Sequence, residues 1–307
     1  MAVYHAGEVA VQRRAGVAHK AGISLRAIRD TVPPVAREFL AAQSFLVLGA
    51  ADPDGRMWST MLAAAPGFLT VPDESVLDVA ARPHPQDPLA EALTQADPHA
   101  PLPVGTIALD PRTRRRMRMN GLAVPTPDGL RLTLDEVVAN CPRHLQVRQP
   151  LAPDAGRPAP APRPAVDSVA LSATQRRTIE AADTFFVATA SDRGAADASH
   201  RGGDPGFVEV LSPTRLRWPD YVGNAMFLTL GNLALSPAAG LLFPDWDTGT
   251  LLHLTGEART RWAGPAERTV EFEVSAVREV GHAVPLRWSA PEYSRFNPPV
   301  PPRRASA

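Results

Sequence analysis

Cysteine and lysine are almost absent from this sequence, and each shortage limits its chemistry. Cys141 is the only cysteine among 307 residues, which excludes an intrachain disulfide and a cysteine-based zinc site and suits a reducing compartment. Lys20 is the only lysine, so nearly every cation is an arginine. Arginine binds phosphate or carboxylate through a planar fork but forms no Schiff base, so a lysine-dependent mechanism would have to use Lys20.

Excess charge and long apolar runs are also missing. The 32 Lys and Arg residues balance 32 Asp and Glu residues, so no chain-wide field favours a nucleic acid or a membrane surface as partner. No apolar run approaches the length of a membrane span, and the N-terminus has no secretory pattern. We therefore expect a soluble, cytoplasmic protein with neither nucleic acid nor membrane as partner.

Several standard catalytic signatures are absent as well. No G-x-G-x-x-G motif follows a strand to open a helix, and there is no Walker loop, no H-E-x-x-H motif and no plausible Ser/His/Asp set. A Rossmann nicotinamide domain is therefore not supported, and we predict no metal site.

Short apolar segments separated by turn signals predict a mainly β fold with peripheral helices. The apolar run Phe45–Ala51 ends at Asp52–Gly55, a good β-turn signal. Residues 1–43 predict helices, the second beginning at Pro33. Short strands with hairpin turns and an inserted helix favour a small barrel over a parallel sheet. Further strands are expected over 57–65, 68–71, 106–110, 116–124 and 130–138, and the inserted helix over 88–95.

A proline-rich segment divides the chain. Prolines at 150, 153, 158, 160, 162 and 164 predict a semi-rigid linker of polyproline II character. The expected organisation is an N-terminal helical segment (1–34), a first barrel (35–149), the linker (150–168), a second barrel (169–282) and a C-terminal tail (283–307).

The two sides of this linker repeat each other. Because the matches keep one order and a nearly constant offset, we interpret the chain as two copies of one β-rich domain. Such a tandem can reproduce the two-fold contact of a homodimer inside one chain, so we expect an intramolecular pseudo-dimer, with a homodimer of whole chains left open. The matches are Phe45–Asp52 with Phe185–Asp192 (140 positions later), Pro66–Val71 with Pro205–Val210 (139 later) and Gly121 with Gly256 (135 later).

The copies differ where a site is expected. The second copy carries Pro219–Leu233, a run dense in Gly, Asn and Thr with aromatic residues at Tyr221 and Phe227, and upstream of it Arg201 stands beside two glycines. Backbone N–H groups at glycine turns, with short amides and hydroxyls, suit a phosphate or the edge of a flavin ring.

The first copy carries a basic strand instead. Arg114, Arg116 and Arg118 alternate along it and should share one face. That face meets either solvent or an anionic ligand bound between the domains. Ordinary structural roles also remain open for Gly223, Gly231 and Asn232 as turn and cap residues around a helix. The same holds for His253 as a packed histidine.

These segments resemble the FMN-binding split barrels of the pyridoxamine 5'-phosphate oxidase type. The resemblance is most specific in Arg201–Val208, Leu216–Asn224 and Gly240–Asp245, with support from Arg115–Gly121 and Ala139–Gln146 in the first copy. It spans about residues 35–148 and 170–280. It implies two tandem FMN-binding split β-barrels that form an intramolecular pseudo-dimer and hold FMN non-covalently in the groove between them.

The resemblance also implies which residues would touch the cofactor. Ser199, His200 and Arg201 would contact phosphate and ribityl, and His200 is the candidate proton donor by residue type. The facing barrel would add Arg116 and Arg118. The remaining candidates are Tyr221, Gly223, Asn224, Met226, Phe227, Thr229 and Asn232 from the following loop, and Arg287 and Trp288 from the tail.

One departure from the family pattern concerns lysine. The oxidases proper commonly place a lysine with an arginine on the FMN phosphate, and no lysine exists in the matching segment 224–232. Arg201, the glycine-turn amides and Thr229 would have to neutralise the phosphate instead. This departure argues against pyridoxamine phosphate oxidation as the specific reaction.

We therefore expect an FMN-dependent oxidoreductase acting on a small molecule, with NAD(P)H or a separate reductase as candidate electron partner. Three alternatives stay open: a deazaflavin (F420)-dependent reductase, a haem-binding or haem-degrading barrel with a histidine axial ligand, and a non-catalytic flavin-binding electron relay.

Overall fold

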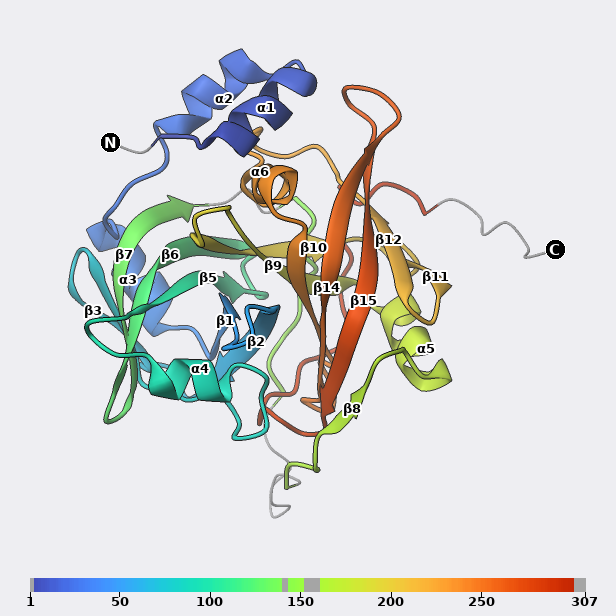
Figure 1. Cartoon of the computed structure of the whole chain (residues 1–307). Helices are drawn as coiled ribbons and strands as arrows, with labels where there is room; N and C mark the ends of the chain where they lie inside the picture. The colour runs from blue at the N-terminus through green and yellow to red at the C-terminus, as the bar shows by residue number, and fades with distance from the viewer. Residues whose placement is uncertain (1–2, 140–142, 152–160, 301–307) are drawn as a thin grey trace.

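The computed structural model describes residues 3–139, 143–151 and 161–300 (Figure 1). Cys141 and the centre of the predicted linker lie outside these residues. The described end of that linker is not all irregular, because Val166–Ser168 forms a short strand, β8. Among the described helices, none is long and apolar enough to cross a membrane.

The first half of the chain forms a seven-stranded antiparallel sheet with the strand order β2-β1-β5-β6-β7-β4-β3. Its elements are α3 (Pro34–Ala41), β1 (Phe45–Ala51), β2 (Met57–Ala63), β3 (Leu69–Asp73), β4 (Val76–Val79), α4 (Ala90–Gln95), β5 (Leu102–Asp110), β6 (Arg115–Thr126) and β7 (Gly129–Ala139).

The second half forms an eight-stranded sheet with the order β10-β9-β13-β14-β15-β12-β11, and β8 adds to β15. The path is the same as in the first sheet, so the predicted mainly β fold with two tandem halves of one design is confirmed. Its elements are α5 (Ala173–Ala181), β9 (Thr184–Ala190), β10 (Ala196–Gly202), β11 (Glu209–Ser212), β12 (Arg215–Pro219), α6 (Leu228–Leu235), β13 (Ala238–Pro244), β14 (Leu251–Trp262) and β15 (Arg268–Val280).

Strand register corrects the predicted alignment of the two copies by one residue. Ala51 pairs with Met57 in the first sheet, and Ala190 pairs with Ala196 in the second. The offset of β1 and β2 is therefore 139 rather than 140, and Ser191, not Asp192, is the counterpart of Asp52. The side chains agree, since Asp52 and Ser191 each accept hydrogen bonds from the two turn amides that follow them.

At two places along the seam between the sheets, a glycine lets the two backbones come close together. A Cβ added to Gly105 in β5 would lie 2.3 Å from the Cα of Asp197 in β10. A Cβ added to its counterpart Gly240 in β13 would lie 2.5 Å from the Cα of Trp58 in β2. Because 58 and 197 differ by the β2–β10 offset of 139, the two contacts are the same contact made twice. The halves are thus related as the subunits of a two-fold dimer are.

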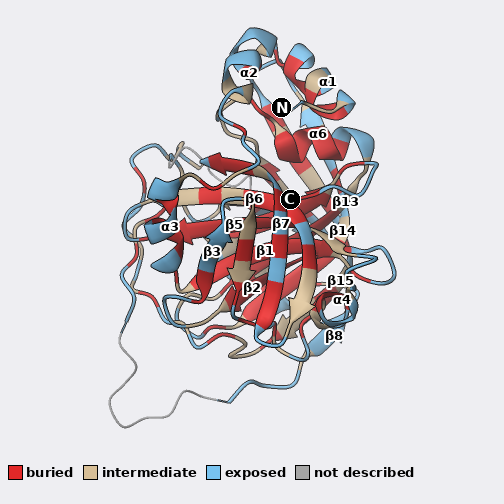
Figure 2. Cartoon of the chain, turned by 90° about the vertical axis from the view of Figure 1, so that its left-hand side faces the viewer, coloured by how far each residue is buried: buried red, intermediate tan, exposed pale blue. Residues whose placement is uncertain are grey.

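Each half encloses its own apolar core, and Figure 2 shows buried residues concentrated on the central strands. In the second half, Phe185 packs against Phe207, Trp218 and Phe243, with ring centroids 5.1–5.8 Å apart. A third cluster, which includes Phe45, Met61 and Leu242, fills the centre of the seam. The centre of the seam is therefore apolar, and the pocket described below lies at its edge.

Two helices, α1 (Ala6–Arg14) and α2 (Ala18–Leu25), precede α3, whereas a single helix was expected before the one predicted at Pro33. In Figure 1 they lie over α6, at the end of the molecule where the two halves meet. His5 and Glu8 form a capping box that closes the first turn of α1. The contact between α1 and α6 is close: a Cβ on Gly7 would lie 2.1 Å from the carbonyl oxygen of Gly231.

Glu8 is expected to make stability depend on pH. Its side chain is buried, and this burial, with Glu136 and Asp197 nearby, raises its pKa to about 8. The folded protein therefore keeps a proton that the unfolded chain loses above its ordinary pKa of 4.5, so this group lowers stability as pH rises between those two values. Relative to wild type, Glu8→Gln should gain at least about 1 kcal/mol between pH ~5 and pH ~8, as measured by urea unfolding. A difference that stays constant with pH would contradict this result.

Candidate functional site

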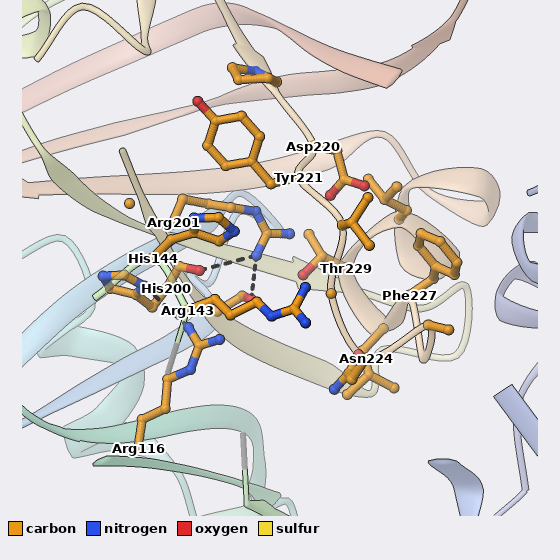
Figure 3. A pocket seen from close by; sticks show the side chains of 18 of the residues that line it. Arg116, Arg143, His144, His200, Arg201, Asp220, Tyr221, Asn224, Phe227 and Thr229 are labelled. Carbon is orange, nitrogen blue, oxygen red and sulfur yellow. Dashed lines mark hydrogen bonds between the residues drawn. The ribbon is translucent and has the colours of Figure 1, made fainter. Parts of the chain in front are cut away.

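A pocket opens at the edge of the seam, between the two halves (Figure 3). Its cavity volume is about 130 Å³, less than the roughly 300–1,000 Å³ of typical small-molecule sites. β6 of the first half forms one side, while β10 and the loop between β12 and α6 form the other. Of the predicted site residues, those that line it are Arg116, Arg118, Ser199, His200, Arg201, Tyr221, Gly223, Asn224, Phe227 and Thr229.

Four predicted residues do not line this pocket. Met226 turns into a small apolar cluster with Ile28, Val138 and Leu228. Asn232 is a buried residue of α6 and donates to Thr189 Oγ1 (3.1 Å).

Arg287 and Trp288 lie elsewhere on the seam. Arg287 pairs with Asp247 at the surface (3.0 Å). Trp288 packs edge-on against Phe45 and Trp246, with ring centroids 6.0 and 6.3 Å away. Trp288, predicted as a cofactor contact in the tail, is therefore an aromatic residue of the apolar cluster at the seam.

The pocket also contains residues that were not among the predicted site residues. Arg143 and His144 come from the segment after β7, and Asp220 lies just before Tyr221. The rings of His144 and Tyr221 pack with centroids 4.8 Å apart. Arg143 and His144 belong to Ala139–Gln146, and Asp220 to Pro219–Leu233, so the sequence had marked both segments but not these residues.

Two guanidinium groups converge on one hydroxyl. Ser199 Oγ accepts hydrogen bonds from Arg118 Nη2 and from Arg201 Nη1, both at 2.7 Å. Arg118 also forms an ion pair with the buried carboxylate of Asp197 (3.0 Å), which in turn accepts from Thr229 (3.3 Å). The charge of Arg118 is thus matched within the protein, and its position is fixed from two sides.

Arg201 has no such carboxylate. Among the described residues, no carboxylate oxygen lies within ion-pair distance of it, and its buried Nε–H has no hydrogen-bond acceptor. Burial lowers the pKa of Arg201 while Asp220 raises it, and arginine stays protonated at neutral pH in either case. The pocket therefore holds a cation whose charge is not matched by a carboxylate within the described residues and can attract an anionic ligand.

His200 is held as a neutral imidazole. Burial lowers its pKa well below the ordinary value, and Arg116 and Arg201 add to this effect. Arg116 Nη1 lies 3.1 Å from His200 Nδ1, and since a guanidinium only donates, Nδ1 accepts and the proton sits on Nε2. A neutral, enclosed imidazole is a weak acid, so this environment does not favour His200 as the proton donor.

The start of α6 presents backbone N–H groups to the pocket. Phe227 at the N-cap position and Ala225 both have left-handed backbone angles, with φ of 60° and 66°. No side chain caps the helix, and Leu228 and Thr229 of its first turn line the pocket. Left-handed residues next to helical ones, at an uncapped N-terminus, form a concave arrangement suited to anions. Strained backbone of this kind occurs at ligand sites.

Arg114 differs from the predicted three-arginine face. It lies in the turn before β6 with a φ of 56° and approaches Glu292 (3.7 Å). The strand begins one residue later, and only Arg116 and Arg118 reach the pocket.

The counterpart of this pocket, on the other side of the seam, has apolar residues at several positions where the pocket has polar ones. By the strand offsets, Leu251 is equivalent to Arg116. Met61 and Leu62 are equivalent to His200 and Arg201. Leu251 and Met61 belong to the apolar cluster of the seam, together with Trp288. His253, the counterpart of Arg118, is fully buried. The two halves have therefore diverged at one pair of equivalent grooves.

The comparisons with known proteins found only distant structural similarity. No family model and no curated protein matches the sequence. Among solved structures, an inferred pyridoxamine 5'-phosphate oxidase from Lactobacillus delbrueckii is 15% identical, with 36% of this chain and 94% of that chain covered and a TM-score of 0.30. The FAD binding protein from Mycobacterium smegmatis is 12% identical, with 38% and 98% covered and a TM-score of 0.26. Each of these two matches spans little more than a third of this chain, and similarity this low assigns no function.

Proposed function

We propose that the chain binds FMN non-covalently in the pocket at the seam and acts as a flavin-dependent oxidoreductase on a small molecule. The observation that carries the proposal is the combination of Arg201, a cation without a carboxylate partner, with an uncapped helix start in one pocket between the halves. Both features favour a ligand with a phosphate group.

The residues present fit such a ligand without lysine. The first-turn N–H groups of α6, the Thr229 hydroxyl and the Arg201 guanidinium would hold the phosphate. Phe207, Tyr221 and Phe227 supply aromatic surface along the pocket, which suits a planar ring system. Arg116 approaches from the first half, so both halves would be needed for the complete site.

The flavin would supply the hydride or electron transfer, as cofactors generally do. The chain's own residues would bind and orient it. Asp197 holds Arg118 and Thr229 in place, and Arg116 fixes the tautomer of His200. A separate reductase or NAD(P)H as electron source is part of this proposal, and consumption of NAD(P)H with and without a reductase distinguishes an enzyme from a relay.

A haem ligand would meet a different constraint. His200 offers no lone pair, because Nδ1 accepts from Arg116 and Nε2 is protonated and enclosed. An axial histidine would have to be His144, at the mouth of the pocket. The geometry therefore favours a phosphate-bearing cofactor over haem.

Titration of the apoprotein with FMN tests the proposal. We expect quenching of flavin fluorescence and saturable binding, with riboflavin binding at least about tenfold more weakly because it lacks the phosphate that the charged donors would hold. Equal affinity for FMN and riboflavin would exclude the phosphate subsite. Absence of flavin binding, with binding of F420 or a Soret band after haem addition, would favour the corresponding alternative.

A further inference from the structure

Side chains of the two N-terminal helices bind the pocket loop from behind. Gln12 Nε2 in α1 donates to the carbonyl oxygen of Met226 (3.0 Å). Ser24 Oγ in α2 donates to the carbonyl oxygen of Asn224 (2.7 Å). Lys20 Nζ reaches the carbonyl oxygen of Gly223 (3.3 Å). Three carbonyls within four consecutive residues of the loop are thus turned toward the N-terminal segment.

The opposite sides of these peptides follow from covalent geometry. A trans peptide is planar, and its C=O and N–H point in opposite directions; the described residues contain no cis peptide. With the Asn224 and Met226 carbonyls held by α2 and α1, the N–H groups of Ala225 and Phe227 point away from these helices. Both residues lie on the pocket wall. These are also the two residues with left-handed backbone angles.

The helix that follows the loop is anchored to the same segment. Besides the close approach of Gly7 to Gly231, the ring of His5 lies 3.0 Å from Asn232 Oδ1 through Nε2. The loop and helix α6 are thus both fixed to the N-terminal segment.

We propose that α1 and α2 are a positioning unit for the ligand site, in which Gln12 and Ser24 orient the 224–227 peptides so that their N–H groups face the bound anion. The identity of that anion, the FMN phosphate, rests on the proposed function. The orientation of the loop does not, so the two can be tested separately.

The variants remove one donor each and leave the fold contacts nearly unchanged. Gln12→Met keeps the length of a buried side chain but loses the amide, and Ser24→Ala loses the hydroxyl. The chain offers matched controls: Gln43 is equally buried and donates to the Phe39 carbonyl, and Ser168 donates to the Ala170 carbonyl (2.8 Å), both away from the pocket. The controls are Gln43→Met and Ser168→Ala, and Ser24→Thr restores a hydroxyl.

Two readouts are needed. The first is amide hydrogen exchange of residues 223–229 in the apoprotein, which needs no ligand. We expect faster exchange there in Gln12→Met and Ser24→Ala, but not in the controls. The second is FMN affinity, which should fall roughly fivefold for each lost hydrogen bond, with Ser24→Thr recovering most of the loss.

Each outcome decides something. Faster loop exchange and weaker FMN binding confined to the two N-terminal variants support the proposal. Unchanged exchange and affinity in both variants overturn it, as does an equal loss in the controls, which would indicate a general stability effect. If wild-type protein binds no FMN, the proposed function fails, and the exchange measurement alone decides whether α1 and α2 orient the loop.

Discussion

Arg201→Ala is expected to weaken FMN binding by about 10- to 100-fold, because a hydrogen bond to a charged partner typically contributes about 1.5–3 kcal/mol. Arg201 is a lining arginine that lacks a carboxylate partner among the described residues, and its guanidinium is already oriented by Ser199 (2.7 Å). Little conformational freedom would be lost when a phosphate binds. Fluorescence titration with FMN measures the effect.

Arg82→Ala is the matched control in the first half. Arg82 is exposed, and its Nη2 donates to the carbonyl oxygens of Thr126 and Pro127 at the turn between β6 and β7, so its loss should leave FMN affinity nearly unchanged. Equal losses in both variants would contradict the assignment of the phosphate subsite to the second half. A normal affinity in Arg201→Ala would contradict it as well.

Gly105→Ala is expected to destabilise the protein by about 3 kcal/mol or more, at the upper end of what overpacking costs. The added methyl group would meet backbone atoms of Asp197 and Ala198, the nearest at 2.3 Å, and backbone cannot move aside as a flexible side chain can. The two sheets would have to separate locally. Chemical denaturation measures the loss, and because Asp197 also holds Arg118, FMN affinity should fall with it.

Gly240→Ala and Gly22→Ala complete this experiment. Gly240 makes the equivalent contact with Trp58 (2.5 Å), so its substitution should cost a similar amount. Gly22, in α2, has no atom within 4 Å of an added Cβ, and alanine there should stabilise the helix by about 0.5–1 kcal/mol. A tolerated alanine at both seam positions would show that the halves do not dock in this way.

Much of the architecture could be predicted from local patterns. Turn signals such as Asp52–Gly55 and the repeated Pro-Gly-Phe segments indicated the hairpins, and the constant spacing of the matches indicated the duplication. The alignment of Phe45 with Phe185 was wrong by one residue because both strands are continuously apolar. A run that is buried on both faces carries no alternation that could fix its register.

Fewer of the site residues could be predicted correctly from local sequence patterns. Sequence placed Arg114 on the face of Arg116 and Arg118 because alternation assumes that the strand has already begun, whereas Arg114 belongs to the preceding turn. Met226 and Trp288 face apolar neighbours, a direction that depends on tertiary packing. Arg143 and His144 could not be ranked, because their proximity to Tyr221 joins positions far apart in the chain.

The two equivalent grooves at the seam differ in their lining residues, and a dimer of identical subunits could not have evolved this difference. In a homodimer every substitution occurs at both equivalent positions, so Leu62 and Arg201 could not coexist there. Covalent fusion of the copies removes that constraint, and one groove could become hydrophobic filling while its twin kept a charged lining. We therefore expect a stoichiometry of one cofactor per polypeptide rather than two.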